Sequence, residues 1–249
     1  HLLMDPDLMK DENLLFCDDE VFGKPSRTKS PEDTVRDIND GSVYLMAYDH
    51  HVKVEGRDIV CPIILFIDKA HVDTKGRLCI EPVSFTLGIF KKEVRKHSFA
   101  WRPLGYITNM SNLTTHVSIE KARDYHYVMK KCLQSLIDHQ KTDGFDWVLT
   151  YKNVRHSVRM KVPVLCVNGD TEGHDKHCGR KLGRSMLLYL CRYCSCPTDR
   201  TDVPTSIKDA GWKYIKGPDI AKYVAEKNDE KLKKLCYHSL DNAFTEVVF

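Results

Sequence analysis

Two aspartates follow the two most apolar short segments of the chain. Asp68 ends the run VCPIILFID at residues 60–68, and Asp170 ends the run VPVLCVNGD at residues 162–170. Short apolar runs bounded by proline and polar residues predict buried strands. Because sites in α/β sheets collect at the carboxyl ends of strands, we expect both carboxylates at that edge of a sheet.

Two carboxylates brought together repel each other unless a cation lies between them. Carboxylate oxygens are hard ligands that suit Mg²⁺ or Mn²⁺. Two such ions on a carboxylate cluster promote in-line attack on a phosphodiester. The alternative is that each aspartate simply meets a turn or caps the next helix, which GDTEGHD at residues 169–175 also allows. The spacing alone does not separate these interpretations.

A second group of chemically active residues is the segment CRYCSCPTDRTDVP at residues 191–204. Cys191 and Cys194 have the Cys-x-x-Cys spacing of half a zinc site, and Cys196 adds a third thiol. Such a site would be structural and would hold an insertion to its domain. The candidates for the remaining ligands are His174, His177 and Cys178 upstream, and Cys236 and His238 downstream. A redox pair and accidental clustering are the alternatives.

The composition is that of a globular protein with a weak basic balance. The 249 residues are 42% hydrophobic and 29% charged, with a formal net charge of +3. That charge alone does not indicate nucleic-acid binding, although basic residues cluster at 91–96 and 177–184. No signal peptide and no apolar run of membrane-spanning length is present, so we expect no membrane segment and a reducing compartment.

The remaining pattern predicts the elements that must position these residues. The strongest helix is expected over residues 117–140, where apolar residues recur at helical spacing. Residues 41–52 fit either a helix or a strand. Further strands are expected at 77–89, 103–108, 145–151 and 154–162, and further helices at 31–38, 218–227 and 229–240.

Several blocks of the sequence carry a family likeness. The pieces are DK.H.D from Asp68 onward, then EPVSFTLGIF, EVR and AWRPLGYI, followed by GDTEGHDKHCGR and CRYCSCP. In this order they resemble the core of the Plavaka-type transposases, which belong with the CACTA-like cut-and-paste DNA transposons. The likeness covers residues 58–110 and 160–200 well.

The resemblance implies a fold and a catalytic centre. The fold is an RNase H-like core, with a mixed five-stranded sheet flanked by helices and a zinc-stapled insertion after the fourth strand. The catalytic triad of such enzymes is Asp, Asp and Glu, holding two Mg²⁺ ions, and Asp68 and Asp170 match the first two positions. Cys191 and Cys194 match the opening of the zinc insertion, which His238 or Cys236 would complete.

The third acid departs from the family pattern. Glu246, in FTEVVF, lies too early and lacks the expected context. We therefore expect the chain to stop before the true glutamate, so that this fragment would be catalytically incomplete. A decayed copy of a mobile element is the alternative, and whether the chain is an active enzyme stays open.

The resemblance also implies DNA as the partner, in the form of transposon ends and target. Basic residues near the expected site are candidates for phosphate contacts, namely Lys69, Lys91, Lys92, Arg95 and Arg102. Ordinary surface charge is the alternative for each of them. A homo-oligomer stays open, and a nuclear location follows only from the presumed DNA substrate.

These expectations divide the chain into three parts. Residues 1–58 would form a flanking segment, 59–184 a partial RNase H-like core, and 185–249 the cysteine-rich insertion with a helical segment. The resulting hypothesis is a transposase-like core for metal-dependent DNA cleavage and strand transfer. The alternative is a non-catalytic, zinc-stapled remnant that binds DNA or protein. A redox protein that uses Cys191 and Cys194 is a third possibility.

Overall fold

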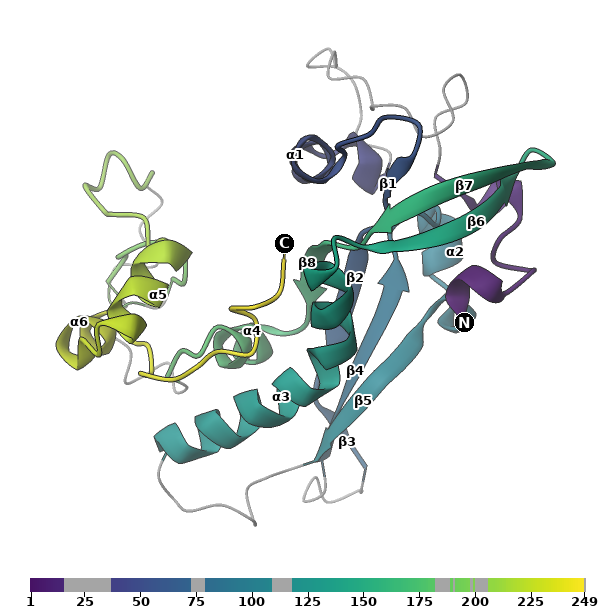
Figure 1. Cartoon of the computed structure of the whole chain (residues 1–249). Helices are drawn as coiled ribbons and strands as arrows, with labels where there is room; N and C mark the ends of the chain where they lie inside the picture. Colours follow the sequence, from purple (N-terminus) through teal and green to yellow (C-terminus); the bar gives the residue numbers. More distant parts are fainter. Residues whose placement is uncertain are drawn as a thin grey trace.

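The computed structural model describes most of the chain (Figure 1). The described residues are 1–15, 37–72, 79–108, 118–181, 189, 191–197, 199 and 206–248. The predicted helix over 31–38 lies largely outside these ranges. None of the described helices is long and apolar enough to cross a membrane.

Two long, bent strands run side by side through the molecule. The first consists of β1 (Asp58–Val60) and β2 (Ile63–Ile67), and the second of β7 (Val154–Lys161) and β8 (Val164–Asn168). A proline interrupts each strand at the bend. The parallel pairing nevertheless continues, because Cys61 N donates to Lys161 O and Ile63 N donates to Pro163 O, both at 2.7 Å. Both predicted strands are thus confirmed as strands and are direct neighbours. β2 is buried except at Phe66, whereas β8 is buried only at Val164, so the prediction of a buried strand is wrong for most of β8.

The main sheet is mixed, with β2 at its centre. It contains β3 (Ala70–His71), β4 (Cys79–Leu87) and β5 (Arg102–Thr108) besides β2 and β8. β4 is antiparallel to β2, and β5 is antiparallel to β4. The short β3 continues the line of β2 along β4, since Ile67 lies opposite Val83 and Ala70 opposite Ile80. Among the described strands of this sheet, β8 is the one that pairs with β2 in parallel.

In the sequence, a hairpin comes directly before β8. β6 (Phe145–Tyr151) pairs antiparallel with β7. Its two turn residues, Lys152 and Asn153, both have positive φ, at 48° and 61°. That is the backbone of a tight two-residue hairpin turn. The hairpin forms a three-stranded sheet with β1 and extends away from the main sheet (Figure 1).

The helix α3 (Ser118–Lys141) covers one face of the main sheet. Its fully buried residues Met129, Leu133 and Ile137 belong to the same hydrophobic core as Leu65 and Val83 of the strands. The 24-residue helix confirms the strongest helix predicted from the sequence. The spacing of its apolar residues accounts for this packing, since positions three and four apart lie on one face.

Both ends of the described chain pack into this core. Leu8 and Leu14 near the beginning, and Ala243 and Val247 near the end, are all buried in it. Val164 N also donates to Val248 O at 2.8 Å, so the C-terminal segment reaches β8. The expected boundaries at residues 58 and 184 stay a prediction.

The remaining helices are short. They are η1 (Leu2–Met4), η2 (Asp11–Asn13), η3 (Ile38–Asp40), α1 (Ser42–His51), α2 (Lys92–Arg95), η4 (Ser98–Ala100), α4 (Thr171–His177), α5 (Gly217–Ala225) and α6 (Asp229–Lys234). Residues 42–51 therefore form a helix and not a strand, which were the two possibilities for residues 41–52. α6 ends earlier than the predicted residue 240, because Cys236 has a φ of 65° and the chain then pairs at Tyr237 with Arg180.

Candidate functional site

The two aspartates leave neighbouring parallel strands at the same edge of the sheet. Phe66 of β2 lies opposite Asn168 of β8, and Asp68 and Asp170 each come two residues later. Asp68 is half-buried and Asp170 is exposed. The structure therefore brings to one edge the two carboxylates on which the catalytic hypothesis depends.

Local hydrogen bonds hold each carboxylate. Asp170 is the N-cap of α4, and its Oδ1 accepts a hydrogen bond from Gly173 N at 2.5 Å. Asp68 Oδ1 accepts from Lys69 N at 2.8 Å. The capping interpretation is thus correct for Asp170. A cap that uses one oxygen leaves the second available as a ligand, so capping and metal binding do not exclude each other.

A buried polar network lies between α3 and α4, next to these strand ends. The hydroxyl of Tyr125 and Nδ1 of His177 are 2.8 Å apart, and both rings are almost fully buried. The Lys176 ammonium lies 3.8 Å from the centre of the Tyr125 ring and forms an ion pair with Glu81 of β4. Neither Tyr125 nor Glu81 stands out in the sequence, because each lies in a pattern that fits an ordinary helix or strand.

Burial determines the protonation of this network. It lowers the pKa of His177 to about 3, with further decreases from the neighbouring His174 and Lys176. It also raises the pKa of Tyr125, and the carboxylate of Glu81 adds to that increase. His177 is thus a neutral imidazole, and Tyr125 a neutral phenol, across the physiological pH range.

The predicted phosphate contacts are divided between the two ends of the sheet. Lys69 is exposed beside Asp68. Lys91, Lys92 and Arg95 follow the end of β4, which lies beside the beginning of β2 (Figure 1). The five residues of β2 span about 16 Å, so these three residues lie well away from the strand-end aspartates.

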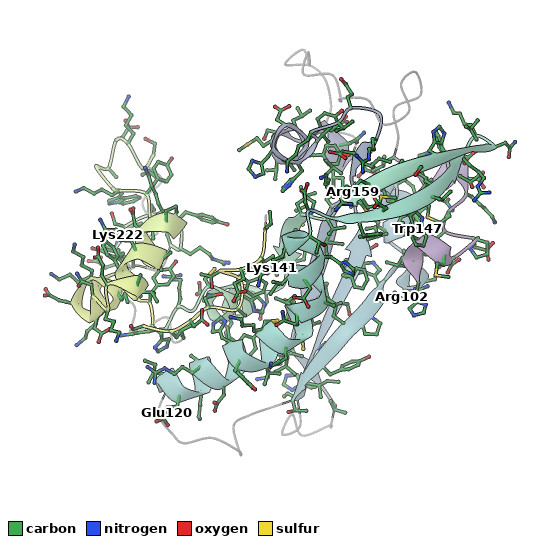
Figure 2. All side chains as sticks on the ribbon, viewed as in Figure 1. Arg102, Glu120, Lys141, Trp147, Arg159 and Lys222 are labelled. Atoms are coloured by element: carbon green, nitrogen blue, oxygen red, sulfur yellow. The ribbon has the colours of Figure 1, made fainter. Side chains whose placement is uncertain are left out.

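Two of the predicted contacts have structural partners. Arg95 is 13% exposed, forms an ion pair with Asp37 and donates from Nε to Phe90 O at 2.8 Å. Arg102 donates to Phe99 O at 2.5 Å and to Asp5 Oδ2 at 3.2 Å. Figure 2 shows it at the beginning of β5, beside the N-terminal segment.

The cysteine segment forms a small ladder of its own. Residues 193–195 pair with residues 213–215, through the bridge between Cys194 and Tyr214. Cys194 is buried, which raises its pKa, and the neighbouring thiol of Cys191 adds to the increase. These two side chains therefore interact, as a Cys-x-x-Cys pair should.

The other two predicted zinc ligands lie on a different segment. His238 N donates to Gly179 O at 2.9 Å, and Cys236 O accepts from Lys181 N at 2.8 Å. Within the described ranges, no three or more His, Cys, Asp or Glu side chains are grouped so that they could hold a metal ion. The full zinc ligand set stays a prediction.

Glu246 is held by two lysines of α3. It forms ion pairs with Lys130 and with Lys141, the latter at 2.8 Å, and Figure 2 shows Lys141 at the end of the helix. These lysines lower the pKa of Glu246 to about 2. Its position therefore agrees with the interpretation that Glu246 is not the third acid of the site.

Comparison with known proteins identifies the family. No curated protein matches the chain. The family model of the Plavaka transposase matches residues 13–172, which is more than half of the chain. The match includes both strand-end aspartates and ends before the cysteine segment. The predicted likeness to the Plavaka transposases is thereby confirmed up to residue 172, and the chain belongs to the Plavaka transposase family.

Proposed function

We propose that this chain carries an RNase H-like catalytic core of the Asp-Asp-Glu type, as in CACTA-like transposases, for metal-dependent DNA cleavage and strand transfer. Asp68 and Asp170 are the two catalytic carboxylates in this proposal. It is supported by the family match over both residues and by a mixed sheet whose central strand and parallel neighbour carry them.

One observation carries the proposal, namely the matching positions of the two aspartates. A parallel pair of strands sends both chains out of the sheet on the same side. In α/β sheets the crevice beyond those ends is where ligands bind. The strands that precede Asp68 and Asp170 end at the same edge, which is where a substrate phosphate would lie in this proposal, although 102 positions separate the two aspartates in the sequence.

The donor set fits Mg²⁺ or Mn²⁺. Mg²⁺ retains several waters and commonly uses one or two carboxylates together with substrate phosphates, so two aspartates are a sufficient protein contribution. A bound pair of ions would activate a water or a 3′-hydroxyl and stabilise the leaving oxygen. The chain's own part is to hold Asp170 through its cap and Asp68 through the Lys69 amide. The ammonium of Lys69 is then placed to contact a DNA phosphate.

We also propose that Cys191 and Cys194 bind a structural zinc ion. The interaction of their thiols and the ladder that supports them favour this role. Cys236 and His238 would have to approach from the segment that pairs with residues 179–181. A nuclear location would follow from the DNA substrate.

The test is Mn²⁺ binding, measured by titration calorimetry on the whole chain. Asp68→Asn and Asp170→Asn each remove one carboxylate charge without changing the size of the side chain, so we expect affinity to fall at least tenfold in each. Asp219→Asn, at an exposed position in α5, is the matched control and should bind as the wild type does. Unchanged binding in all three variants would instead favour the non-catalytic, zinc-stapled remnant.

A further inference from the structure

We infer that His177 is a positioning residue that links α4 to the end of β2 and so sets how Asp170 and Asp68 face each other. The inference rests on the proposed function, because it concerns the same two carboxylates. His177 itself does not lie at the reacting atoms. His177 acts through the backbone that carries Asp68 and Asp170.

The first side of this link is the contact of His177 with α3. Nδ1 of the ring and the Tyr125 hydroxyl are 2.8 Å apart, and the two rings stack at a centroid distance of 6.0 Å. Phe244 packs on the ring as well, at 5.9 Å. His177 is only 5% exposed, so its orientation is determined by these neighbours.

The second side is the buried Nε2 atom, which has no hydrogen-bond partner among the described residues. It lies near two glycines that flank Asp170, namely Gly169 before it and Gly173 in the first turn of α4. A methyl carbon added at Gly173 would lie 3.6 Å from Nε2, 2.9 Å from Asp170 Oδ1 and 3.9 Å from Ile67 O. One added at Gly169 would lie 2.4 Å from Ile67 O and 4.0 Å from Nε2. The ring nitrogen, the Asp170 carboxylate and the last carbonyl of β2 therefore surround one small space.

The charge state of the ring determines what Nε2 can do there. Burial keeps the imidazole neutral, with a pKa of about 3, and the Ile67 carbonyl acts against this decrease. A neutral imidazole has one N–H donor and one acceptor nitrogen. If Nδ1 accepts from the Tyr125 hydroxyl, Nε2 carries the hydrogen, and Ile67 O borders the same small space. Ile67 immediately precedes Asp68, so the Tyr125–His177 pair connects α3 with both strand ends.

The contrast with His126 makes the assignment specific. His126 is also buried, and its Nε2 likewise has no partner among the described residues. Its Nδ1, however, accepts from Ala243 N at 3.3 Å, in the C-terminal segment and not at a strand end. His126→Phe is a comparison for His177→Phe, since each variant keeps a ring and removes both nitrogens, and the His126 ring also lies 5.4 Å from the Tyr125 ring and beside the Lys176 backbone.

The experiment compares the two histidine variants, together with Tyr125→Phe and Asp68→Asn, in two measurements. In the metal-free protein, nuclear magnetic resonance should show His177 protonated at Nε2. The Ile67 carbonyl shift should change in His177→Phe and not in His126→Phe. In the Mn²⁺ titration, residues that orient metal ligands typically contribute at least tenfold in affinity, so His177→Phe should bind about tenfold more weakly. Tyr125→Phe removes only the hydroxyl that contacts the His177 ring, so it should reduce the Mn²⁺ affinity less. It replaces His177→Phe in the test if that variant does not fold.

The two measurements separate the inference from the proposed function. Wild-type Mn²⁺ affinity in His177→Phe and Tyr125→Phe, with loss in Asp68→Asn, would overturn the role of His177 and leave the proposed function standing. Wild-type affinity in Asp68→Asn would overturn the proposed function. The positioning role would then be decided by the resonance data, and an unchanged Ile67 carbonyl shift in His177→Phe would refute it.

Discussion

Phe66 in β2 and Asn168 in β8 lie directly opposite each other in a parallel ladder. From this pair the two chains leave the sheet together, so Asp68 and Asp170 reach the same edge. The residue after β8, Gly169, is so close to the Ile67 carbonyl that a side chain there would overlap it. The spacing of the aspartates therefore depends on a contact between two backbones.

Replacing Gly169 by alanine should separate the strand ends. The added methyl carbon would lie 2.4 Å from Ile67 O, and a backbone carbonyl cannot turn aside as a side chain can. We expect a loss of about 1–3 kcal/mol in the free energy of unfolding, together with weaker Mn²⁺ binding. Urea denaturation and calorimetry measure the two effects. Gly217→Ala, where no atom lies within 4 Å of the added carbon, should change neither, and equal effects in both variants would contradict the explanation.

The buried pair of Arg180 and Asp175 should be a major source of stability for the region after α4. Arg180 Nη1 donates to Asp175 Oδ1 at 2.7 Å, and the arginine side chain is completely buried. Arg180→Met would leave the Asp175 carboxylate buried without this partner, at a cost of about 3 kcal/mol. The free energy of unfolding in urea measures this loss.

An exposed ion pair provides the control for that measurement. Lys234 and Glu230 lie 2.9 Å apart on α6, with side chains that are 67% and 80% exposed. Solvent screens such pairs, so Lys234→Met should leave the unfolding transition unchanged. A loss in Arg180→Met no larger than in Lys234→Met would show that the buried pair is dispensable.

Acid should destabilise the fold through its two buried histidines. Burial lowers the pKa of His126 to about 4 and that of His177 to about 3, whereas the unfolded chain titrates near 6.5. Below pH 6.5 the unfolded state binds more protons, so stability falls as the pH decreases toward these folded values. It is independent of both rings above pH 7. Each ring contributes a slope of about 1.4 kcal/mol per pH unit.

The free energy of unfolding between pH 5 and pH 8 tests this dependence. Below pH 6.5, His126→Phe and His177→Phe should each reduce the change of the unfolding free energy with pH by the contribution of one histidine. The curves above pH 7 should stay parallel to that of the wild type. If both variants keep the wild-type slope, the buried histidines do not control acid stability.

Lys69 and Arg95 should respond differently in DNA binding, although both were predicted as phosphate contacts. Lys69 is exposed beside the aspartates, whereas Arg95 is bound to Asp37. Lys69→Ala should weaken binding to duplex DNA and reduce the dependence of log affinity on log salt by about one unit. Arg95→Ala should mainly lower stability. Fluorescence anisotropy at several salt concentrations measures the slopes, and the reverse result would place DNA at the other end of the sheet.

The cysteine pair should hold zinc in the purified protein. Cys191→Ser and Cys194→Ser should each lose the metal, because a serine hydroxyl is a poor replacement for a thiolate ligand. Cys61→Ser is the control, since Cys61 is buried in the core with a pKa raised to about 12. Elemental analysis measures the zinc content. A metal-free protein with a reversible Cys191–Cys194 disulfide would support the redox alternative.

Local pattern was enough to locate the elements that carry the aspartates. Two kinds of pattern were used, each of which depends on neighbours a few positions away. They are the apolar runs before Asp68 and Asp170 and the spacing of apolar residues over the helix predicted at 117–140. Such periodicities report which face of a strand or helix is buried. The order of the sequence blocks was likewise enough to suggest the Plavaka family, which the family match confirms.

Contacts between distant parts of the chain were decided only by the tertiary structure. The parallel pairing of β2 with β8, the ion pair of Arg95 with Asp37 and the contact of His177 with Tyr125 each join residues more than 50 positions apart. No local spacing encodes such contacts, because they depend on how whole elements pack. The sequence by itself therefore determined which residues are able to do chemistry. The packing of the sheet and of α3 decided that the two aspartates share one edge while most of the predicted basic residues lie at the other.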